Sequence, residues 1–344
     1  MIDLRSDTAT RPTAGMRAAI AAAAVGDEQK REDPTVNAFE ERAARLLGQD
    51  EAIFLPTATM ANQIAIRLHT EPGDELLGEE NCHVFISELG GPAVHSGVVT
   101  RGLAGIDGRF GSEQVRAARR IPAVHSPRTR LLWVENTHNA SGGRIWPLDE
   151  IGDLHALALE LDLRFHLDGA RLLNAAVATG IRAAEIGSRF DTVTLCLSKG
   201  LGCPLGAILG GRAEVMANAR RLKHLFGGAM RQAGIVAAAG IYALDNNVDR
   251  LADDHARAKR LALGLAEAGL GVDPDRVETN FVQIDVAPLT PHEAMARLAE
   301  QGVGLSATIH PTILRAVTHL DVGDDEIDVA LDAIPRALGA RVRA

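Results

Sequence analysis

Three stretches of this sequence end an apolar run on polar side chains that could do chemistry together. Residues 129–136 ("TRLLWVEN") lead into "THN", residues 162–168 ("DLRFHLD") end on an aspartate, and residues 191–198 ("DTVTLCLS") are followed by Lys199. Lys199 follows Asp168 by 31 residues, which is about the length of one βαβ unit. We therefore expect both side chains to project from neighbouring or near-neighbouring strand ends into one crevice, although any single polar strand end also has a purely structural explanation.

An amine and a carboxylate in one crevice form at least an ion pair, and they are also what pyridoxal 5′-phosphate (PLP) requires. The lysine forms a Schiff base with the aldehyde of the cofactor, and the aspartate keeps the pyridine nitrogen protonated. The phosphate needs an anion site, and "LPTATMANQ" offers Ala58 and Thr59 at the start of an amphipathic segment, where helical N–H groups are free. The alternative is that Thr57 or Thr59 is only a helix N-cap.

The elements that must position these groups alternate between short apolar runs and amphipathic segments from Ile53 to Gly211. Further strands are expected at 74–79, 97–102 and 206–211, and helices at 148–161 and 170–178. Asp33 as N-cap and Pro34 at the first position predict another helix before this block. Strands separated by helices predict an α/β fold with a large, doubly wound, mostly parallel sheet.

The pattern of expected elements changes after this block. A long helical region is expected from Gln232 to about Leu270, and the strands and helices after it predict a small α+β lobe. We expect an N-terminal crossover segment (1–14), a large PLP-binding domain (15–247) and a small C-terminal domain (248–344).

The composition excludes several classes of protein. The 344 residues carry a net charge of −9, which disfavours nucleic acid and anionic membranes as partners, and no run approaches the length of a membrane span. Three cysteines without a CxxC pair indicate a reducing, cytoplasmic location. No GxGxxG after the first strand, GxxxxGK[ST], GxSxG or HExxH motif is present, and the H-x-D at 166–168 lacks an evident third ligand, so no metal site is predicted.

Charged side chains outside the crevice are expected to be incidental. Arg220, Arg221, Lys223 and His224 are interpreted as one solvated helix face. The histidines expected on helix or loop surfaces are His69, His95, His155, His224 and His255.

The motifs of the chain occur in the order of a known family. They are "DLRSDTATRPT", "DPTVN", "ATMANQ", "ENTHN", "HLDGARLLNA", "LSKGLG", "MRQAGIVAAAGIYAL" and "RAVTHLD". With these, the chain resembles the low-specificity L-threonine aldolases, which are PLP enzymes of fold type I. The resemblance implies cleavage of L-threonine, L-allo-threonine or a related β-hydroxy-α-amino acid to glycine and an aldehyde. It also implies a homotetramer, a dimer of dimers whose subunits share active sites.

The resemblance also implies roles for matching positions. Lys199 corresponds to the Schiff-base lysine, Asp168 to the partner of the pyridine nitrogen, and His83 to the imidazole that stacks on the cofactor ring. Ala58 and Thr59 fall at the phosphate-binding turn. The positions that match residues near the substrate are Ser6, Arg171 and Arg315 for its carboxylate, His125 for its hydroxyl, and Arg231 with a less specific role.

Two departures from the family pattern are visible. The family's "YGDDPTVN" is "KREDPTVN" in this chain, so that Lys30 and Arg31 replace a tyrosine and a glycine, and Ala58 replaces a glycine. Two added cations near a site predict a preference for acidic or phosphorylated substrates.

The sequence offers three candidates for the general base: His83, His125 and a water bound between them. The alternative functions are a β-eliminating lyase, an aminotransferase, or a PLP-binding homologue with weak turnover.

Overall fold

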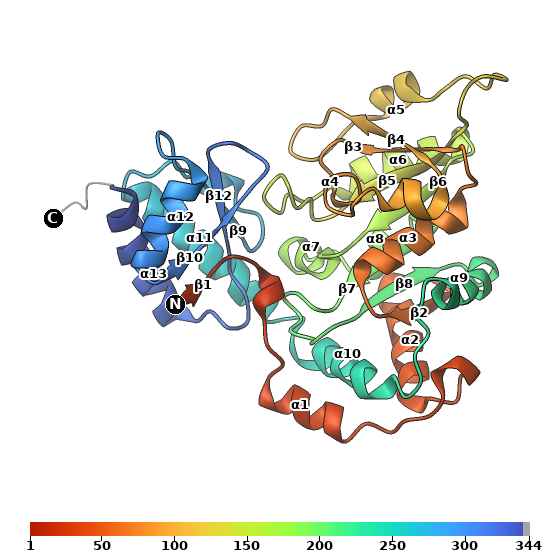
Figure 1. Ribbon diagram of the computed structural model, residues 1–344, viewed down its shortest axis with the longest axis horizontal. Helices are drawn as coiled ribbons and strands as arrows, with labels where there is room; N and C mark the ends of the chain where they lie inside the picture. Colours follow the sequence, from red (N-terminus) through yellow and green to blue (C-terminus); the bar gives the residue numbers. More distant parts are fainter. Residues whose placement is uncertain (340–344) are drawn as a thin grey trace.

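A seven-stranded sheet forms the centre of the larger lobe in the computed structural model, which describes residues 1–339 (Figure 1). Its order is β2-β8-β7-β6-β5-β3-β4; β8 runs antiparallel to both neighbours and the other pairs are parallel. The strands are β2 (Glu51–Leu55), β3 (Glu75–Glu79), β4 (Val99–Leu103), β5 (Thr129–Glu135), β6 (Arg164–Asp168), β7 (Thr192–Cys196) and β8 (Ala207–Gly211). The mostly parallel sheet and the α/β class predicted from the sequence are confirmed.

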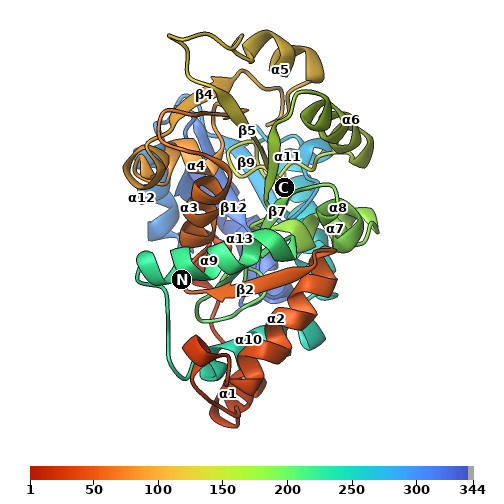
Figure 2. The same ribbon diagram turned by 90° about the vertical axis from the view of Figure 1, so that its right-hand side faces the viewer.

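Helices cover both faces of this sheet. They are α1 (Ala14–Ala21), α2 (Pro34–Leu47), α3 (Ala58–His69), α4 (His83–Ile86), α5 (Ser112–Ala118), α6 (Leu148–Glu160), α7 (Leu172–Thr179), α8 (Ala183–Gly187), α9 (Ala213–Leu225) and α10 (Gly234–Asn246). Figure 2 shows α3 and α4 on one side and α6, α7 and α8 on the other. On β5, Leu132 and Val134 join the core under α6, whereas Leu131 and Trp133 pack toward α4. Burial on both faces explains why the strands read as continuous apolar runs.

The helix predicted after Asp33 begins and ends as its sequence indicates. Asp33 Oδ1 accepts the backbone N–H groups of Thr35 and Val36, and Pro34 occupies the first turn. Gly48 ends α2 with φ of +65°, a left-handed conformation that suits glycine. This helix packs against α10 and β2 and so supports the strand that leads to Thr57.

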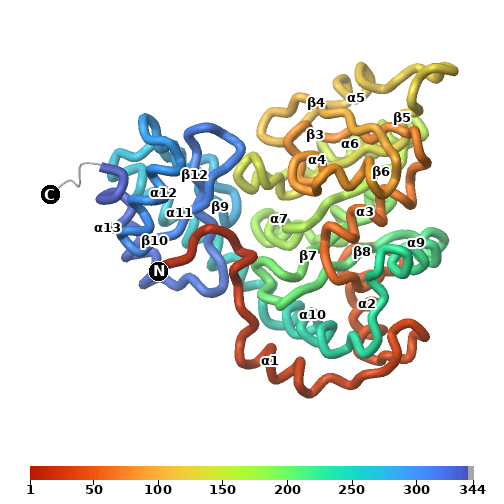
Figure 3. Tube along the Cα trace, in the orientation of Figure 1, coloured from red at the N-terminus to blue at the C-terminus, as the bar shows by residue number. Residues whose placement is uncertain are grey.

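The smaller lobe combines α11 (Leu251–Glu267), α12 (Pro291–Glu300) and α13 (Asp324–Leu338) with two small sheets. The antiparallel sheet has the order β11 (Ser306–Ala307), β12 (Ile313–Val317), β9 (Phe281–Asp285). β1 (Ile2–Asp3) pairs with β10 (Val303–Gly304) in parallel. The first strand therefore belongs to this lobe, and the chain then runs on to α1 beneath the larger lobe (Figure 3).

The helical region predicted from Gln232 to Leu270 is two helices, α10 and α11, separated at residues 247–250. Leu251 packs in the core of the larger lobe, whereas Ala258 and Leu261, in the same helix, pack in the core of the smaller one. The domain boundaries at residues 14 and 247 stay predictions. No helix within residues 1–339 is long and apolar enough to cross a membrane.

The interpretation of α9 as a solvated basic face is wrong for one of its members. Lys223 is 2% exposed; its Nζ donates to the carbonyl of Phe54 at 2.6 Å and pairs with Glu28. Arg220 reaches Glu40 at 2.8 Å. Burial lowers the pKa of Lys223, against the opposing effect of Glu28. Lys223 and Arg220 therefore join this face of α9 to β2, to α2 and to the segment before α2.

The expectation of surface histidines is also wrong in one place. His69, in the last turn of α3, is buried, and its Nε2 lies 2.9 Å from Thr192 Oγ1. Burial lowers its pKa to about 4, so the ring is neutral at pH 7.

Candidate active site

The carboxyl ends of β5, β6 and β7 gather the predicted chemical groups at one edge of the large sheet. Pairing places Glu135 opposite Asp168, and Asp168 opposite Thr194. β7 ends at Cys196, and Lys199 follows three residues later. Asp168 and Lys199 thus extend from adjacent strands, as their separation in the sequence predicts.

Asp168 is buried, and both of its carboxylate oxygens are hydrogen-bonded. Oδ1 accepts the backbone N–H of Ala170 at 3.1 Å, and Oδ2 accepts Nδ2 of Asn62, on α3, at 2.8 Å. These donors offset the cost of burying the carboxylate and hold it in one orientation.

Lys199 is held through its backbone rather than through its amine. Its carbonyl accepts Thr10 Oγ1 at 2.8 Å and the N–H of Gly202, also at 2.8 Å. Gly202 has φ of +74°, a conformation that favours glycine and explains the "KGLG" pattern. Within residues 1–339 the Nζ group of Lys199 makes no hydrogen bond or ion pair, so it is available to a ligand.

His83 begins α4 at the same edge and is tied to two carboxylates. Its backbone N–H donates to Glu135 Oε2 at 2.5 Å, and its Nδ1 lies 2.9 Å from Glu88 Oε1. The hydrogen bond with Glu88 is the main cause that raises the pKa of His83. Glu135 Oε1 also accepts the N–H of Asn139 at 2.7 Å, so one carboxylate positions two sides of the site.

The turn that the sequence indicates for a phosphate is the N-terminus of α3. Thr57 is its N-cap, and Thr57 Oγ1 accepts the N–H of Met60 at 3.1 Å. The backbone N–H groups of Ala58 and Thr59 have no such acceptor within the described residues. The two readings of this turn are therefore compatible: Thr57 caps the helix, and the next two N–H groups remain free for an anion.

Arg171 and Arg315 lie together, but they are engaged differently. Arg171 Nε and Nη2 donate to the two oxygens of Asp7, both at 2.7 Å, and this pair is buried. Arg315 Nη1 donates to Asn139 Oδ1 at 2.9 Å, and its Nε is buried without a partner. Both guanidinium groups lie over the ring of Phe281, at 4.7 and 5.6 Å. Arg315 therefore has the greater free donor capacity.

The carboxyl of Asp7 has a lowered pKa of about 2. Burial alone would raise the pKa, but the adjacent Arg171 charge and its hydrogen bonds outweigh it, and Lys199 adds to the lowering. Ser6 precedes this carboxylate and accepts the N–H of Thr8 at 3.2 Å as the cap of η1 (Asp7–Ala9). The N-terminal segment thus supplies the anion that neutralises Arg171.

Lys30, Arg31 and Arg231 lie around one turn, which Glu28 joins through Lys223 to the end of β2. Lys30 ends η2 (Glu28–Lys30), Arg31 follows it, and Glu28 N–H donates to the carbonyl of Arg231 at 2.9 Å. Arg231 is exposed and reaches Asp27 at 3.3 Å. In the described part of one chain, no hydrogen bond or ion pair joins these three side chains to the carboxyl edge of the sheet.

Arg31 occupies the position at which the family pattern has glycine, and its backbone shows why. Its φ is +61° and its ψ is 30°, the left-handed region in which a side chain is disfavoured. Its carbonyl accepts Asn37 Nδ2 at 2.7 Å, which holds the turn against α2.

His125 is distant from the carboxyl edge of the sheet within one chain. It lies in the exposed loop at 121–126, just before β5, whereas the site lies at the other end of that strand, beyond Glu135. A strand of seven residues spans about 20 Å.

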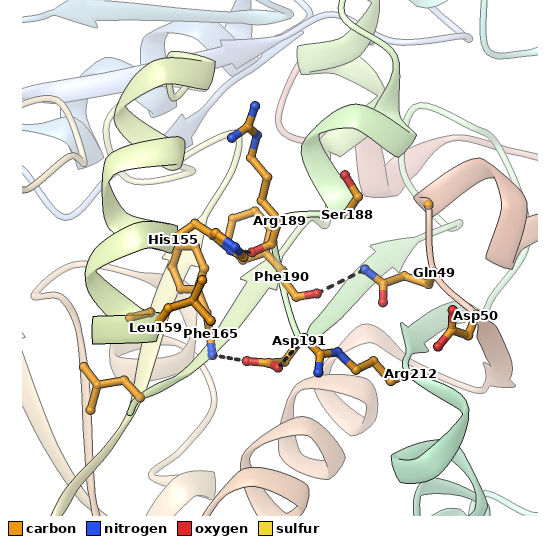
Figure 4. Close-up of a pocket in the computed structure, with 13 residues that line it drawn as sticks. Gln49, Asp50, His155, Leu159, Phe165, Ser188, Arg189, Phe190, Asp191 and Arg212 are labelled. Carbon is orange, nitrogen blue, oxygen red and sulfur yellow. Dashed lines mark hydrogen bonds and ion pairs between the residues drawn. The ribbon is translucent and has the colours of Figure 1, made fainter. Parts of the chain in front are cut away.

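A pocket at the opposite, amino end of the sheet is separate from this site (Figure 4). Several of its polar groups bond to one another: Asp191 Oδ2 accepts the N–H of Phe165 at 2.8 Å, and Gln49 Nε2 donates to the carbonyl of Phe190 at 3.3 Å. The pocket is a packing groove between the ends of α2 and α8.

Several residues of the site were not assigned from the sequence. Asp7 and Asn139 lie inside the quoted motifs, and the arginines they contact were recognised, so the motifs carried a usable signal. Asn62 and Gln63 also lie inside a quoted motif, "ATMANQ", whereas Glu88 lies outside all of them, because its place depends on α3 packing beside the turn after α4.

Comparison with known proteins places this chain and its fold in a class. The beta-eliminating lyase family model matches residues 3–288. The solved structure of a threonine aldolase from Leishmania major superposes with a TM-score of 0.84 at 20% identity, covering 98% of this chain and 100% of that one. The fold is that of the PLP enzymes of fold type I, as the sequence predicts.

Two curated relatives identify a narrower family within this class. The low specificity L-threonine aldolase of Escherichia coli K12 is 42% identical over 329 residues, covering 95% of this chain and 96% of its own. Low-specificity L-threonine aldolase 1 of Arabidopsis thaliana is 35% identical over 345 residues, covering 98% and 96%. The chain therefore belongs to the low-specificity L-threonine aldolases within the beta-eliminating lyase family.

Proposed function

We propose that this protein cleaves L-threonine, L-allo-threonine or a related β-hydroxy-α-amino acid to glycine and an aldehyde with the help of PLP. The observation that carries the proposal is the placement of Lys199 and Asp168 on adjacent strand ends, in a chain of this family. Aminotransferases and β-eliminating lyases share these two groups, so the product distinguishes the functions.

The donor set at the carboxyl edge fits PLP. Lys199 offers an unpaired amine for covalent attachment, and the fixed carboxylate of Asp168 suits a protonated pyridine nitrogen. The free N–H groups of Ala58 and Thr59 suit the phosphate, and the His83 ring would lie on the face of the cofactor. When bound, PLP supplies the electron sink that breaking the Cα–Cβ bond requires.

The chain's own residues bind the substrate and move its proton. Arg315, with unpaired donors, holds the substrate carboxylate, while Arg171 and Ser6 act beside it. His83 accepts the proton of the β-hydroxyl directly or through a water. His125 lies at the far end of β5, so a role for it requires a second subunit.

We further propose a cytoplasmic homotetramer with shared sites. Exposed apolar side chains follow directly on His83 in the sequence: Leu89 is 99% exposed and Val94 is 75% exposed. Such side chains favour contact with another subunit. In shared sites, Lys30, Arg31 and Arg231 would act at the site of their own chain or at a neighbour's.

The decisive experiment measures the products of L-threonine with PLP-loaded protein. Glycine and acetaldehyde are expected in equal amounts from the wild type and none from Lys199→Ala. Borohydride treatment should leave the cofactor covalently attached to the peptide that contains Lys199. Lys259→Ala is the matched control, because this lysine lies on α11 of the smaller lobe and pairs there with Asp275; the variant should keep both the cofactor and the activity. Formation of a 2-oxo acid in place of glycine would refute the aldolase proposal.

A further inference from the structure

A buried carboxylate without a role in the proposed reaction lies directly beside His83. Glu88 follows α4, and its side chain is fully buried. Oε1 receives Asn62 Nδ2 at 2.8 Å and lies 2.9 Å from His83 Nδ1, and Oε2 receives Gln63 Nε2 at 2.7 Å. A buried carboxylate with three donors is held in one position.

The chemistry of this contact defines which nitrogen of His83 carries a proton. An ionised carboxylate only accepts hydrogen bonds, so Nδ1 must be the N–H donor to Glu88. In the neutral ring, Nε2 then has the lone pair. Within residues 1–339 Nε2 makes no hydrogen bond, so it is the nitrogen available to a ligand.

The same contact joins His83 to the group proposed to hold the pyridine nitrogen. Asn62 Nδ2 donates both to Glu88 Oε1 and to Asp168 Oδ2, at 2.8 Å each. His83, Glu88 and Asp168 each place one atom within 4.8 Å of the other two. Asn62 and Gln63 lie on α3, the helix whose first turn offers the phosphate site, so a single helix positions both ends of the proposed cofactor site.

The backbone around Glu88 is adapted to this position. Leu89 has φ of +54°, an unfavourable conformation for leucine that costs about 1 kcal/mol or more. A Cβ on Gly91 would lie 2.7 Å from Gln63 Nε2, so a larger residue there would displace the amide that donates to Glu88. The surrounding packing offsets this local strain and keeps the carboxylate in place.

We propose that Glu88 is a positioning residue that fixes the ring orientation and the Nδ1–H tautomer of His83, so that Nε2 serves as the proton acceptor. This inference rests on the proposed function, because it assigns the working nitrogen of the proposed base. Asn62 aligns Glu88 with Asp168, so the two carboxylates and the imidazole act as one unit.

The charged groups around His83 determine how its pKa changes when Glu88 is replaced. The charged groups that face it are Glu88, Glu135 at the end of β5 and Asp168 at the end of β6, and each raises its pKa. Glu88→Gln removes one of these negative charges, so the pKa of His83 must fall. If neutral His83 is the base, the acidic limb of the kcat/KM profile moves to lower pH.

The test measures the tautomer directly, by ¹⁵N NMR of histidine-labelled protein without and with PLP. The His83 signals are assigned by their loss in His83→Asn. Wild-type protein is expected to show Nδ1–H with unprotonated Nε2 above the pKa. Glu88→Gln keeps this tautomer, because its amide oxygen still accepts, but titrates at lower pH. Glu88→Ala loses the preference, and its kcat falls by about 10- to 100-fold, the size of effect known for partners that orient metal-bound histidines.

Glu75→Gln is the matched control. Glu75 is equally buried and pairs with Arg120 at 2.6 Å, but it begins β3, at the amino end of the sheet. Its variant should leave the His83 signals unchanged. An unchanged tautomer in Glu88→Ala, or an equal shift in Glu75→Gln, overturns the proposal, and Glu88→Gln decides the matter if the alanine variant does not fold. Failure of the aldolase proposal would appear separately, as wild-type protein that releases no glycine.

Discussion

Replacing Asp7 by asparagine should destabilise the protein severely although the shape of the side chain is kept. Asp7 is fully buried and receives both donors of Arg171 at 2.7 Å. A pKa lowered from 3.8 to about 2 corresponds to about 2–3 kcal/mol of stability at neutral pH. Asparagine also leaves the Arg171 charge buried without a counter-ion, so we expect a loss of about 3–5 kcal/mol.

The assay is equilibrium unfolding in urea at pH 7, at one protein concentration and without PLP, so that ligand and subunit effects are constant. Asp321→Asn is the control, because its pair with Arg11 is long, at 3.4 Å, and Arg11 is exposed; a loss below about 1 kcal/mol is expected. Equal losses in the two variants would refute the reasoning.

The pH dependence gives a second check on the same pair. Because the pKa of Asp7 is lower in the folded state than in the unfolded chain, its contribution is complete above about pH 4. The contribution is lost as the pH falls from about 4 toward 2. The difference in stability between wild type and Asp7→Asn should therefore shrink over that range, whereas a constant difference would point to packing alone.

Two further predictions concern arginines. Arg31→Gly should stabilise the protein by about 0.5–1 kcal/mol, because φ of +61° suits glycine; thermal unfolding checks this against Lys30→Gly, where φ is not positive and no gain is expected. Arg315→Gln should raise KM for L-threonine about tenfold or more with a smaller effect on kcat, because its unpaired donors would bind the substrate carboxylate. Steady-state glycine formation measures the effect, with the exposed Arg5→Gln as control, and an unchanged KM would exclude Arg315 from substrate binding.

The large sheet and the helix after Asp33 were predictable because their signals are local. Strands buried on both faces are apolar throughout, and the cap at Asp33 depends only on the residues that follow it. The placement of Asp168 and Lys199 on adjacent strands was predictable for the same reason, since a βαβ repeat has a nearly constant length.

The rest depends on contacts between distant segments. Lys223 looks like a surface lysine on a polar helix, and only the approach of Glu28 and the Phe54 carbonyl buries it. Glu88 is one glutamate among many until α3 brings Asn62 to it.

The N-terminal segment has a practical consequence for protein engineering. β1 pairs in the smaller lobe, Asp7 neutralises Arg171 between the lobes, and Thr10 holds the carbonyl of Lys199. Random mutagenesis aimed at a new substrate range would alter folding and reactivity together if it included these first residues. Libraries directed at Arg315 and the turn at Lys30 avoid that coupling, and an affinity tag is better placed far from Ile2.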